Sequence, residues 1–461
     1  MDRNALKSLE KWKNSPNRKP LIIQGARQVG KTWLIKEFGS RNYKNVAYLS
    51  FVDNPNADKI FQGDFNLENL LTGIELLSQT KIDAENTLIV FDEIQECGRA
   101  LTALKFFNEN AKNYHIISAG SLLGVAVRKR RYSFPVGQVD FLNLYPLTFT
   151  EFLEALGEKE LLKLITNKSW EMINVFHDKY VYYLKLYFFI GGMPESVQSF
   201  LQYRNFEEVR KIQRNILLGY QEDFSKYTEG SNIPKIMAVW NCLPSQLAKE
   251  NKKFLYKDIQ KGARAREFEN AIEWLLLTGL IYKVPRINQP NLPISAYQDN
   301  AFKLYGLDTG LLATQSGLDA KVIMEGDSIF KEFKGALTEQ FVLQELKAIS
   351  NSTNANGSIS DLPIYYWGRE NAKAELDFVI QKQNLIIPIE VKASINLKAR
   401  SLAVYRNIYQ PQIAIRTSLA NFEVNQGLHN VPLYLLARYL GLDHQPIYLA
   451  PNNANKSSAG N

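Results

Sequence analysis

The sequence contains little cysteine and little histidine. Its two cysteines, Cys97 and Cys242, lie far apart without a C-x-x-C spacing, and its four histidines are equally scattered along 461 residues. Disulfide frameworks and structural zinc sites need such residues at close, repeated spacings. The sequence therefore excludes both, and we expect a protein of the reducing cytoplasm.

Long apolar runs are also lacking. No stretch reaches the roughly 18 uncharged apolar residues that a membrane-spanning helix needs. The apolar stretch at residues 181–192 is interrupted by Lys185 and predicts a buried helix. Residues 1–20 have the pattern of a polar amphipathic helix, unlike a signal peptide. We therefore expect no membrane partner, and the sequence has no internal repeats.

The composition is that of a globular protein with a basic balance. Apolar residues make up 45% and charged residues 22%, and 55 lysines and arginines against 47 aspartates and glutamates give a formal charge of +8. A chain of this length is long enough for about three domains. The positive balance is mild evidence for a nucleic-acid partner.

One loop predicts a phosphate site. Residues 25–32 match G-x-x-x-x-G-K-[ST], after an apolar strand at 21–23 and before an amphipathic helix. Glycines let successive backbone N–H groups point at one phosphate, and the helix N-terminus adds positive charge. We expect Lys31 to reach the β- and γ-phosphates and the Thr32 hydroxyl to bind Mg²⁺. The alternative is a chance match in a Gly/Lys turn. The expected nucleotide contacts are Gly25, Ala26, Arg27, Gln28, Val29, Gly30, Lys31 and Thr32.

A second apolar run ends in two carboxylates. Residues 88–91 have the fully apolar pattern of a buried parallel strand, and Asp92 and Glu93 follow directly. At that strand end Asp92 is placed to hold Mg²⁺ through water, and Glu93 is placed to orient or deprotonate the attacking water. Alone, the pair could instead cap the next helix. With the upstream loop, it predicts ATP hydrolysis, with ATP and Mg²⁺ as the ligands.

A third predicted strand, around Ile116 and Ile117, brings two hydroxyls to the same edge of the sheet. Ser118 and Ser121 follow its apolar part, where the carboxyl edge of a parallel sheet faces its ligand. Either hydroxyl could sense the γ-phosphate or position the water. Ser121 is thus a catalytic candidate beside Glu93. An ordinary Ser/Gly turn is the alternative.

The periodicity changes along the chain and predicts several regions. Strands alternate with amphipathic helices over residues 1–160, which indicates a parallel α/β sheet, and an aromatic-rich helical pattern over 161–230 suits a lid over the nucleotide. Residues 231–325 contain short helices, a longer helix at about 264–278 and an apolar strand, which suits a winged helix-turn-helix. Residues 451–461 are small and polar and predict a disordered tail.

Basic side chains would face DNA in such a winged helix. Winged helices also serve as protein-interaction and lid modules, so both DNA and a protein partner stay open. Acidic residues on the longer helix, which are Glu267, Glu269 and Glu273, oppose DNA on part of its face. The basic residues expected to face phosphate are Lys257, Lys261, Arg264 and Arg266.

Residues 326–450 contain a second possible chemistry. Two apolar runs joined by a polar turn at residues 381–384 predict adjacent strands. Side chains alternate along a strand, so Glu390 and Lys392 share one face and Asp377 can lie beside them. Converging carboxylates bind Mg²⁺, and a nearby lysine can hold or activate a hydroxide that attacks a phosphodiester. A solvated Glu-x-Lys pair is the alternative. The predicted constellation is Asp377, Glu390 and Lys392, with Glu339 as a fourth member.

Several blocks of the sequence resemble one family, the archaeal and bacterial AAA-type ATPases that carry a C-terminal domain of unknown function with a restriction-endonuclease-like core. The resemblance is carried by the phosphate loop, "LIVFDE", "SAGSLL", "FPVGQVDFLNLYPLTFTEFL", "YFFIGGMPESV" and "FKGALTEQFVLQEL". It extends from about the first helix to about residue 440. It implies an AAA-type ATPase core and a PD-(D/E)xK nuclease-like domain.

One position departs from that family. Many relatives have Gly-Arg where this sequence has Gly137-Gln138, and that arginine is a natural partner for nucleotide charge. Arg128, Arg130 and Arg131 are candidates for an arginine finger, in cis or across a subunit interface. A solvated loop or a contact with a phosphate backbone is the alternative. The need for a homo-oligomer therefore stays open.

Together these observations predict an α/β protein with a P-loop AAA-type parallel sheet, a helical lid, a winged helix and a C-terminal restriction-endonuclease-like domain at residues 326–450. We expect a cytoplasmic Mg-dependent ATPase coupled to DNA binding or processing. The alternative is a nucleotide-dependent switch or scaffold whose C-terminal domain binds protein or nucleic acid without cleaving it. A kinase is disfavoured, because Glu93 beside Asp92 suits attack by water.

Overall fold

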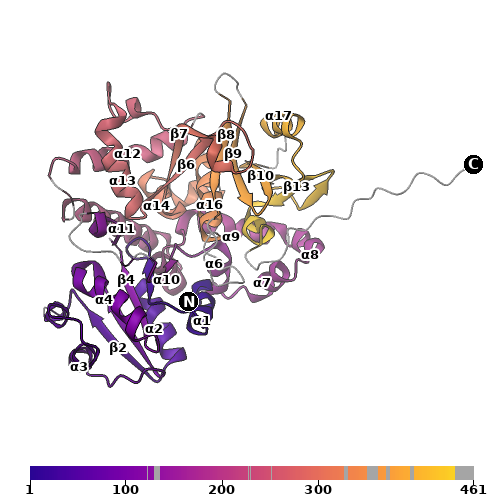
Figure 1. Cartoon of the computed structure of the whole chain (residues 1–461). Coiled ribbons are helices and arrows are strands. Elements are labelled where there is room, and N and C mark those ends of the chain that lie inside the picture. Colours follow the sequence, from indigo (N-terminus) through magenta and orange to yellow (C-terminus); the bar gives the residue numbers. More distant parts are fainter. Residues whose placement is uncertain are drawn as a thin grey trace, which may run out of the picture.

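The computed structural model describes the chain as two sheets with helices between and around them (Figure 1). The described residues are 1–54, 56–121, 123–128, 135, 137–226, 228, 230–250, 252–325, 331–349, 362–369, 374–394 and 399–441. The predicted tail at residues 451–461 lies outside them.

The N-terminal part is built on a parallel sheet of five strands in the order β2-β3-β4-β1-β5. The three strands predicted from apolar runs are confirmed as β1, β3 and β4. Every residue of β3 is buried, as expected for a strand that is covered on both faces. The strands are β1 (Leu21–Gln24), β2 (Asn45–Ser50), β3 (Thr87–Asp92), β4 (His115–Gly120) and β5 (Asp140–Asn143). The helices are α1 (Asn4–Lys13), α2 (Lys31–Asn42), η1 (Asp58–Phe61), α3 (Leu67–Ser78), η2 (Ile94–Glu96), α4 (Gly98–Asn110) and α5 (Leu123–Arg128).

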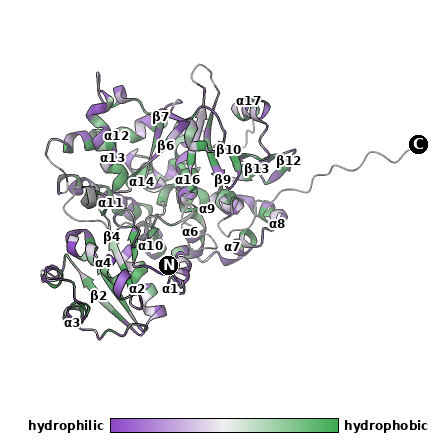
Figure 2. Ribbon diagram, viewed as in Figure 1, coloured by the Kyte–Doolittle hydropathy of each residue, from purple (hydrophilic) through white to green (hydrophobic). Residues whose placement is uncertain are grey.

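Side chains of this sheet alternate between two apolar cores. Along β3, Leu88 and Val90 belong to one core, and Ile89 and Phe91 belong to the other. The first core continues through the central helices into the second sheet. Figure 2 shows the apolar residues following the strands and the inner faces of the helices. The two sheets are therefore connected by continuous packing.

The central helices cover the region predicted to be a helical lid. The apolar stretch at residues 181–192 falls largely in α9, whose last five residues are all buried, as predicted for a buried helix. These helices are α6 (Phe149–Ala155), α7 (Lys159–Thr166), α8 (Trp170–Val175), α9 (His177–Ile190), α10 (Pro194–Tyr203) and α11 (Phe206–Lys226).

The second sheet has eight strands in the order β12-β13-β11-β10-β9-β8-β6-β7. It crosses the predicted boundary between residues 325 and 326, because β6 pairs in parallel with β8 at Arg286 and Tyr366. The two predicted regions therefore share one sheet, and this pairing covers an edge of β6 that would otherwise be open. The strands are β6 (Ile281–Ile287), β7 (Gln298–Gly306), β8 (Ile364–Gly368), β9 (Glu375–Lys382), β10 (Leu385–Val391), β11 (Ala414–Ser418), β12 (Glu423–Asn425) and β13 (Leu428–Pro432).

The helices around this sheet include the longer helix that the sequence predicts at about 264–278. It is α13 (Ala265–Leu277), and the hairpin of β6 and β7 follows it. The remaining helices are α12 (Ile233–Ala248), η3 (Tyr256–Asp258), η4 (Ile294–Tyr297), α14 (Thr309–Gln315), α15 (Ala320–Glu325), α16 (Lys331–Ile349), α17 (Arg400–Tyr409), η5 (Leu433–Leu435) and α18 (Leu436–Tyr439).

Candidate functional site

The loop at residues 25–30 connects β1 to α2, as the motif predicts. Gly25 has φ +150°, and a Cβ there would lie 2.3 Å from the backbone oxygen of Leu144, so only glycine fits. Gly30 precedes α2 in the left-handed region with φ 95°. Lys31 is the first residue of α2, and its Nζ donates to the carbonyls of Gly25 (2.9 Å) and Ala26 (2.8 Å). Two carbonyls of the loop thus hold the amine of Lys31.

Lys31 is a buried cation whose hydrogen-bond acceptors are uncharged. Burial lowers the pKa of Lys31 from 10.5 to about 8, while the charges of Glu93 and Asp92 raise it and that of Arg27 lowers it. The two carboxylates thus compensate only part of the cost of burial. An anionic ligand in the loop would favour the protonated amine.

Thr32 and Asp92 meet at the position where the sequence predicts Mg²⁺. The Thr32 hydroxyl donates to Asp92 Oδ2 at 3.0 Å, and the Tyr48 hydroxyl donates to the same oxygen. A hydroxyl and a carboxylate beside a phosphate loop are oxygen donors of the kind that Mg²⁺ takes. The residues therefore fit the ion that the loop implies. Among the described residues, no group of three or more His, Cys, Asp or Glu side chains is arranged to hold a metal by itself.

Glu93 lies directly after β3 and accepts hydrogen bonds from η2 and from the residue that follows β4. Its φ is 53°, in the left-handed region, and its Oε2 accepts from Gln95 Nε2 at 2.5 Å and from Ser121 Oγ at 3.5 Å. Ser118 lies inside β4, completely buried. Of the two predicted serines, Ser121 is the one that reaches Glu93. Gln95 was not predicted.

Helix α11, in the region predicted to be a lid, contacts the phosphate loop. Asp223 is 8% exposed and forms an ion pair with Arg27, and the Tyr220 hydroxyl donates to the Arg27 carbonyl at 2.9 Å. Burial raises the pKa of Asp223, and Arg27 lowers it. Asp223 and Tyr220 were not predicted from the sequence, because they lie almost 200 residues from the loop.

A cavity of about 480 Å³ lies beside the end of the loop. Gly30 lies next to Pro194 of α10, since a Cβ on Gly30 would lie 3.4 Å from Pro194 Cγ. The lining combines large apolar groups with a few polar side chains, which is typical of small-molecule sites. Its apolar members include Met1, Trp33, Leu147, Pro194 and Ile212, and its polar members include Glu195, Gln198 and Ser199.

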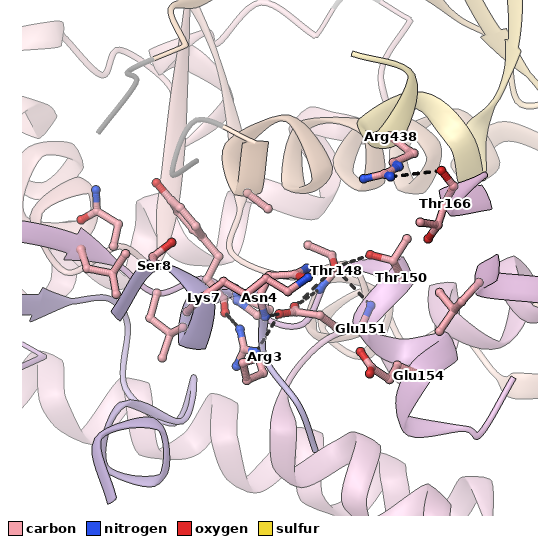
Figure 3. A pocket seen from close by; sticks show the side chains of 18 of the residues that line it. Arg3, Asn4, Lys7, Ser8, Thr148, Thr150, Glu151, Glu154, Thr166 and Arg438 are labelled. Carbon is pink, nitrogen blue, oxygen red and sulfur yellow. Dashed lines mark hydrogen bonds and ion pairs between the residues drawn. The ribbon is translucent and has the colours of Figure 1, made fainter. Parts of the chain in front are cut away.

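Arg3 fixes the other side of the loop. It is 7% exposed, its Nη1 donates to the Val29 carbonyl at 3.1 Å, and its Nε pairs with Glu151 at 3.2 Å. Glu151 also closes a capping box with Thr148 at the start of α6. Figure 3 shows Arg3 and Glu151 pointing toward one another in a cavity of about 530 Å³. α1, the loop and α6 therefore form one junction, and the role of Arg3 in it was not predicted from the sequence.

The four residues of the predicted nuclease constellation come together at β9, β10 and α16. Asp377 lies on β9 beside β10, and its Oδ2 accepts the backbone N–H of Val391 at 2.8 Å. Lys392 follows β10 and pairs with Glu390 at 2.6 Å. Burial raises the pKa of Asp377 well above its ordinary value, and the charges of Glu339 and Glu390 add to this. The predicted convergence is therefore present.

Two further lysines join these carboxylates, and neither was predicted from the sequence. Lys252 pairs with Glu339, and Lys303 of β7 pairs with Glu375 at 2.6 Å. We call Glu339, Glu375, Asp377 and Glu390 the carboxylate cluster. Burial alone would lower the pKa of Lys303, but Glu339, Glu375 and Asp377 raise it above its ordinary value. The lysines supply the positive charge here, so the residues as placed do not fit the metal ion that a nuclease-like fold implies.

The remaining predicted residues fall into three groups. Gln138 is described, and its Oε1 accepts from Asn108 Nδ2 at 2.5 Å. The side chains of Arg128, Arg130 and Arg131 lie outside the described part of the chain, so the arginine-finger prediction stays a prediction. The basic residues before and at the start of α13 are all exposed, and they are Lys257, Lys261, Arg264 and Arg266.

Family comparisons cover three segments of the chain. Residues 17–153 match the family described as an AAA domain. Residues 182–322 and 334–436 match two families described as domains of unknown function, DUF8612 and DUF4143. A search of curated proteins finds no match. Within the described residues, no helix is both long enough and apolar enough to span a bilayer.

Solved structures give distant likenesses. The Walker-type ATPase PABY2304 of Pyrococcus abyssi is 14% identical over 68% of this chain and 95% of its own, with a TM-score of 0.43. The ORC2 protein of Aeropyrum pernix is 11% identical over 75% and 94%, with a TM-score of 0.31. The RuvB branch migration motor of Thermotoga maritima is 13% identical over 62% and 90%, with a TM-score of 0.27. Likenesses at these TM-scores carry no functional conclusion. The AAA-domain match and the geometry of the loop make residues 17–153 an AAA-type P-loop domain.

Proposed function

We propose that the chain is a nucleotide-dependent switch that binds Mg-ATP at residues 25–32, hydrolyses it, and couples the nucleotide state to DNA binding. The observation that carries this proposal is the placement of Lys31. Its buried amine is held by loop carbonyls next to the Thr32 and Asp92 pair, and burial depresses its pKa. Triphosphate oxygens would supply the negative charge that this amine needs.

Each side chain of the site has a role in hydrolysis. Lys31 binds the β- and γ-phosphates, and Thr32 and Asp92 hold Mg²⁺, which neutralises phosphate charge when bound. Glu93 accepts a proton from the water that attacks the γ-phosphorus, and the bond from that phosphorus to the β–γ bridging oxygen breaks. Ser121 and Gln95 orient Glu93, in keeping with their hydrogen bonds to its carboxylate.

The cavity beside Gly30 suits the base of the nucleotide. It begins at the end of the phosphate loop, and its apolar members Trp33 and Pro194 offer surfaces for a planar ring. Glu195 and Gln198 lie in the same lining and can bond to polar edges of a base. Adenine fits these requirements, which makes ATP the proposed nucleotide.

Helix α13 offers a physical connection between the nucleotide and DNA. Its N-terminal end carries the exposed Arg264 and Arg266, and after its C-terminal end a Cβ on Gly279 would lie 3.5 Å from the backbone nitrogen of Ala26 in the loop. The order of α12, η3, α13 and the β6–β7 hairpin supports a winged helix that also forms the edge of the larger sheet. We propose that movement of the loop is transmitted along α13 to this basic face.

The DNA part of the proposal has its own test. Replacing Lys257 and Lys261 by alanine should weaken binding to duplex DNA and reduce the slope of log affinity against log salt, by about 0.9 for each phosphate that is no longer neutralised. The matched control removes two exposed lysines of the lid, with Lys163→Ala and Lys211→Ala. Equal binding and equal slopes for both double variants would refute the basic face as a DNA site.

The C-terminal domain supports binding without cleavage better than it supports a nuclease. The order α16, β8, β9, β10, α17 and β11 is consistent with a restriction-endonuclease-like core, but lysines already pair with Glu339, Glu375 and Glu390. We therefore favour a switch whose C-terminal domain contacts nucleic acid without cutting it. Cleavage of duplex or branched DNA in Mg²⁺, abolished by Asp377→Ala, would contradict this.

ATP turnover tests the central part of the proposal. Lys31→Ala should lose at least about 10²-fold in hydrolysis rate, because transition-state charge on the phosphates loses its cation. The matched control is Lys105→Ala, an exposed lysine of α4 that should turn over at the wild-type rate. Undetectable hydrolysis by the wild type, or equal rates for both variants, would overturn the proposed function.

A further inference from the structure

The acids of the carboxylate cluster and two of the cations that balance them come from different parts of the chain. The acids lie on α16, β9 and β10, whereas Lys252 precedes η3 and Lys303 lies on β7. Lys303 is 1% exposed and lies over the Tyr366 ring, with Nζ 4.7 Å from its centroid. Lys252 is 12% exposed and lies outside any helix or strand. Of these two lysines, Lys252 is therefore the one that can be withdrawn without dismantling the sheet.

The oxygens of the cluster show what Lys252 does. Both oxygens of Glu339 are in use, since Oε1 accepts from Lys252 and Oε2 accepts from the Tyr305 hydroxyl at 3.1 Å. Glu390 Oε1 is held by Lys392, but among the described residues Glu390 Oε2 is buried without a hydrogen-bond partner. Within the described part of the chain, Glu390 Oε2 thus lacks a donor, while a lysine occupies Glu339 Oε1.

We propose that Lys252 is a built-in cation that replaces a divalent metal ion at Glu339, so that the cluster binds Mg²⁺ or Mn²⁺ only when Lys252 is withdrawn. Divalent cations need several oxygen ligands, and Glu339 supplies one only if its Oε1 is released. With that oxygen released, Glu339 joins Asp377 and Glu390 Oε2 as a set of hard oxygen donors. The proposal concerns this cluster alone and does not depend on the nucleotide site.

Mn²⁺ binding to the full chain without nucleotide, followed by electron paramagnetic resonance, tests the proposal. Lys252→Met keeps the apolar stem and removes the charge, and Lys253→Met is the matched neighbour. We expect Lys252→Met to gain one Mn²⁺ site at this cluster. Its affinity for Mn²⁺ should be at least about tenfold higher than that of any site at the cluster in the wild type or in Lys253→Met. Adding Glu339→Gln should remove that site.

Two outcomes overturn the proposal. One is a wild-type Mn²⁺ site that Glu339→Gln removes and that is as tight as the site in Lys252→Met. The other is a folded Lys252→Met chain, judged by its thermal unfolding, that gains no site. If Lys252→Met does not fold, comparison of the wild type with Glu339→Gln decides. Equal Mn²⁺ counts support the proposal, and a site that disappears in Glu339→Gln overturns it.

Discussion

The phosphate-loop site and the carboxylate cluster both contain a buried lysine near carboxylates, yet the pKa of that lysine is shifted in opposite directions at the two sites. Burial depresses the pKa of Lys31 to about 8, and nearby Glu93 and Asp92 do not restore it. Burial would depress the pKa of Lys303 as well, but Glu339, Glu375 and Asp377 raise it above its ordinary value. A lysine short of negative charge favours an anionic ligand, and a lysine already paired does not. The phosphate-loop lysine therefore favours an anionic ligand, whereas Lys303 already has carboxylate partners from the same chain.

The largest expected effect tests whether the carboxylates beside the phosphate loop act on a ligand. Glu93→Gln keeps the size and the neighbours of the side chain but cannot accept the proton of water. We expect ATP binding to persist and hydrolysis to fall by about 10²–10³-fold in single-turnover assays. Glu96→Gln, an exposed carboxylate three positions away, is the control. Wild-type turnover by Glu93→Gln would break the comparison, because Glu93 would then have no catalytic task.

The comparison also predicts opposite signs in stability. Lys303→Met leaves Glu375 without its cation and the buried Glu339 and Asp377 less compensated, so we expect a loss of about 2–4 kcal/mol, with Glu375's partial exposure reducing the cost. Lys31→Met removes a cation whose burial costs about 3 kcal/mol at pH 7, so even without its two hydrogen bonds we expect a gain of about 1 kcal/mol. Urea unfolding at pH 7 measures both. Changes in the free energy of unfolding that have the same sign in both variants would refute the distinction between the two lysines.

A smaller effect, in pH dependence, sharpens the same point. The pKa of Lys31 is about 8 in the folded chain and 10.5 ordinarily. The neutral amine is buried without a charge cost above pH 10.5, so the chain is most stable there. This stability is lost as the pH falls through 8, where the buried amine becomes charged. Phosphate favours the protonated amine, so ATP binding should take up a proton. The affinity for ATP should fall by up to about tenfold per pH unit above pH 8. Calorimetry in buffers of different ionisation enthalpy measures this uptake.

The control for that experiment is Lys31→Arg. A guanidinium stays protonated throughout this range, so any ATP binding that survives the substitution should not change between pH 8 and pH 9.5. An affinity of the wild type that is also flat over this interval would show that Lys31 does not titrate on binding.

The sequence predicted the parts of both sites that local patterns encode. Residues 25–32 and Asp92 lie where a motif and an apolar strand predict them, and Glu390 meets Asp377 because side chains alternate along paired strands. Lys252 was missed because its partner Glu339 is 87 residues away and no periodicity connects the two. Asp223 and Arg27 are farther apart still, at 196 residues.

One missed residue did leave a signal. Lys303 is a lone cation in the apolar stretch "AFKLYG" of β7, where every side chain is buried. A buried lysine needs a carboxylate partner, so this strand could have been connected to the acids downstream. The shared sheet was harder to predict. The pairing of β6 with β8 joins strands from two regions, and the sequence pattern of each region already suited a separate domain.

The central claim is that the wild-type chain holds a divalent metal ion with nucleotide at the phosphate loop and holds none at the carboxylate cluster. Equilibrium dialysis of Mn²⁺ with a non-hydrolysable ATP analogue tests it most directly, with Lys31→Ala alongside. We predict one bound Mn²⁺ per chain with the analogue, none at the same Mn²⁺ concentration without it, and none in Lys31→Ala. Mn²⁺ bound without nucleotide, unchanged in Lys31→Ala and abolished by Asp377→Ala, would contradict the account.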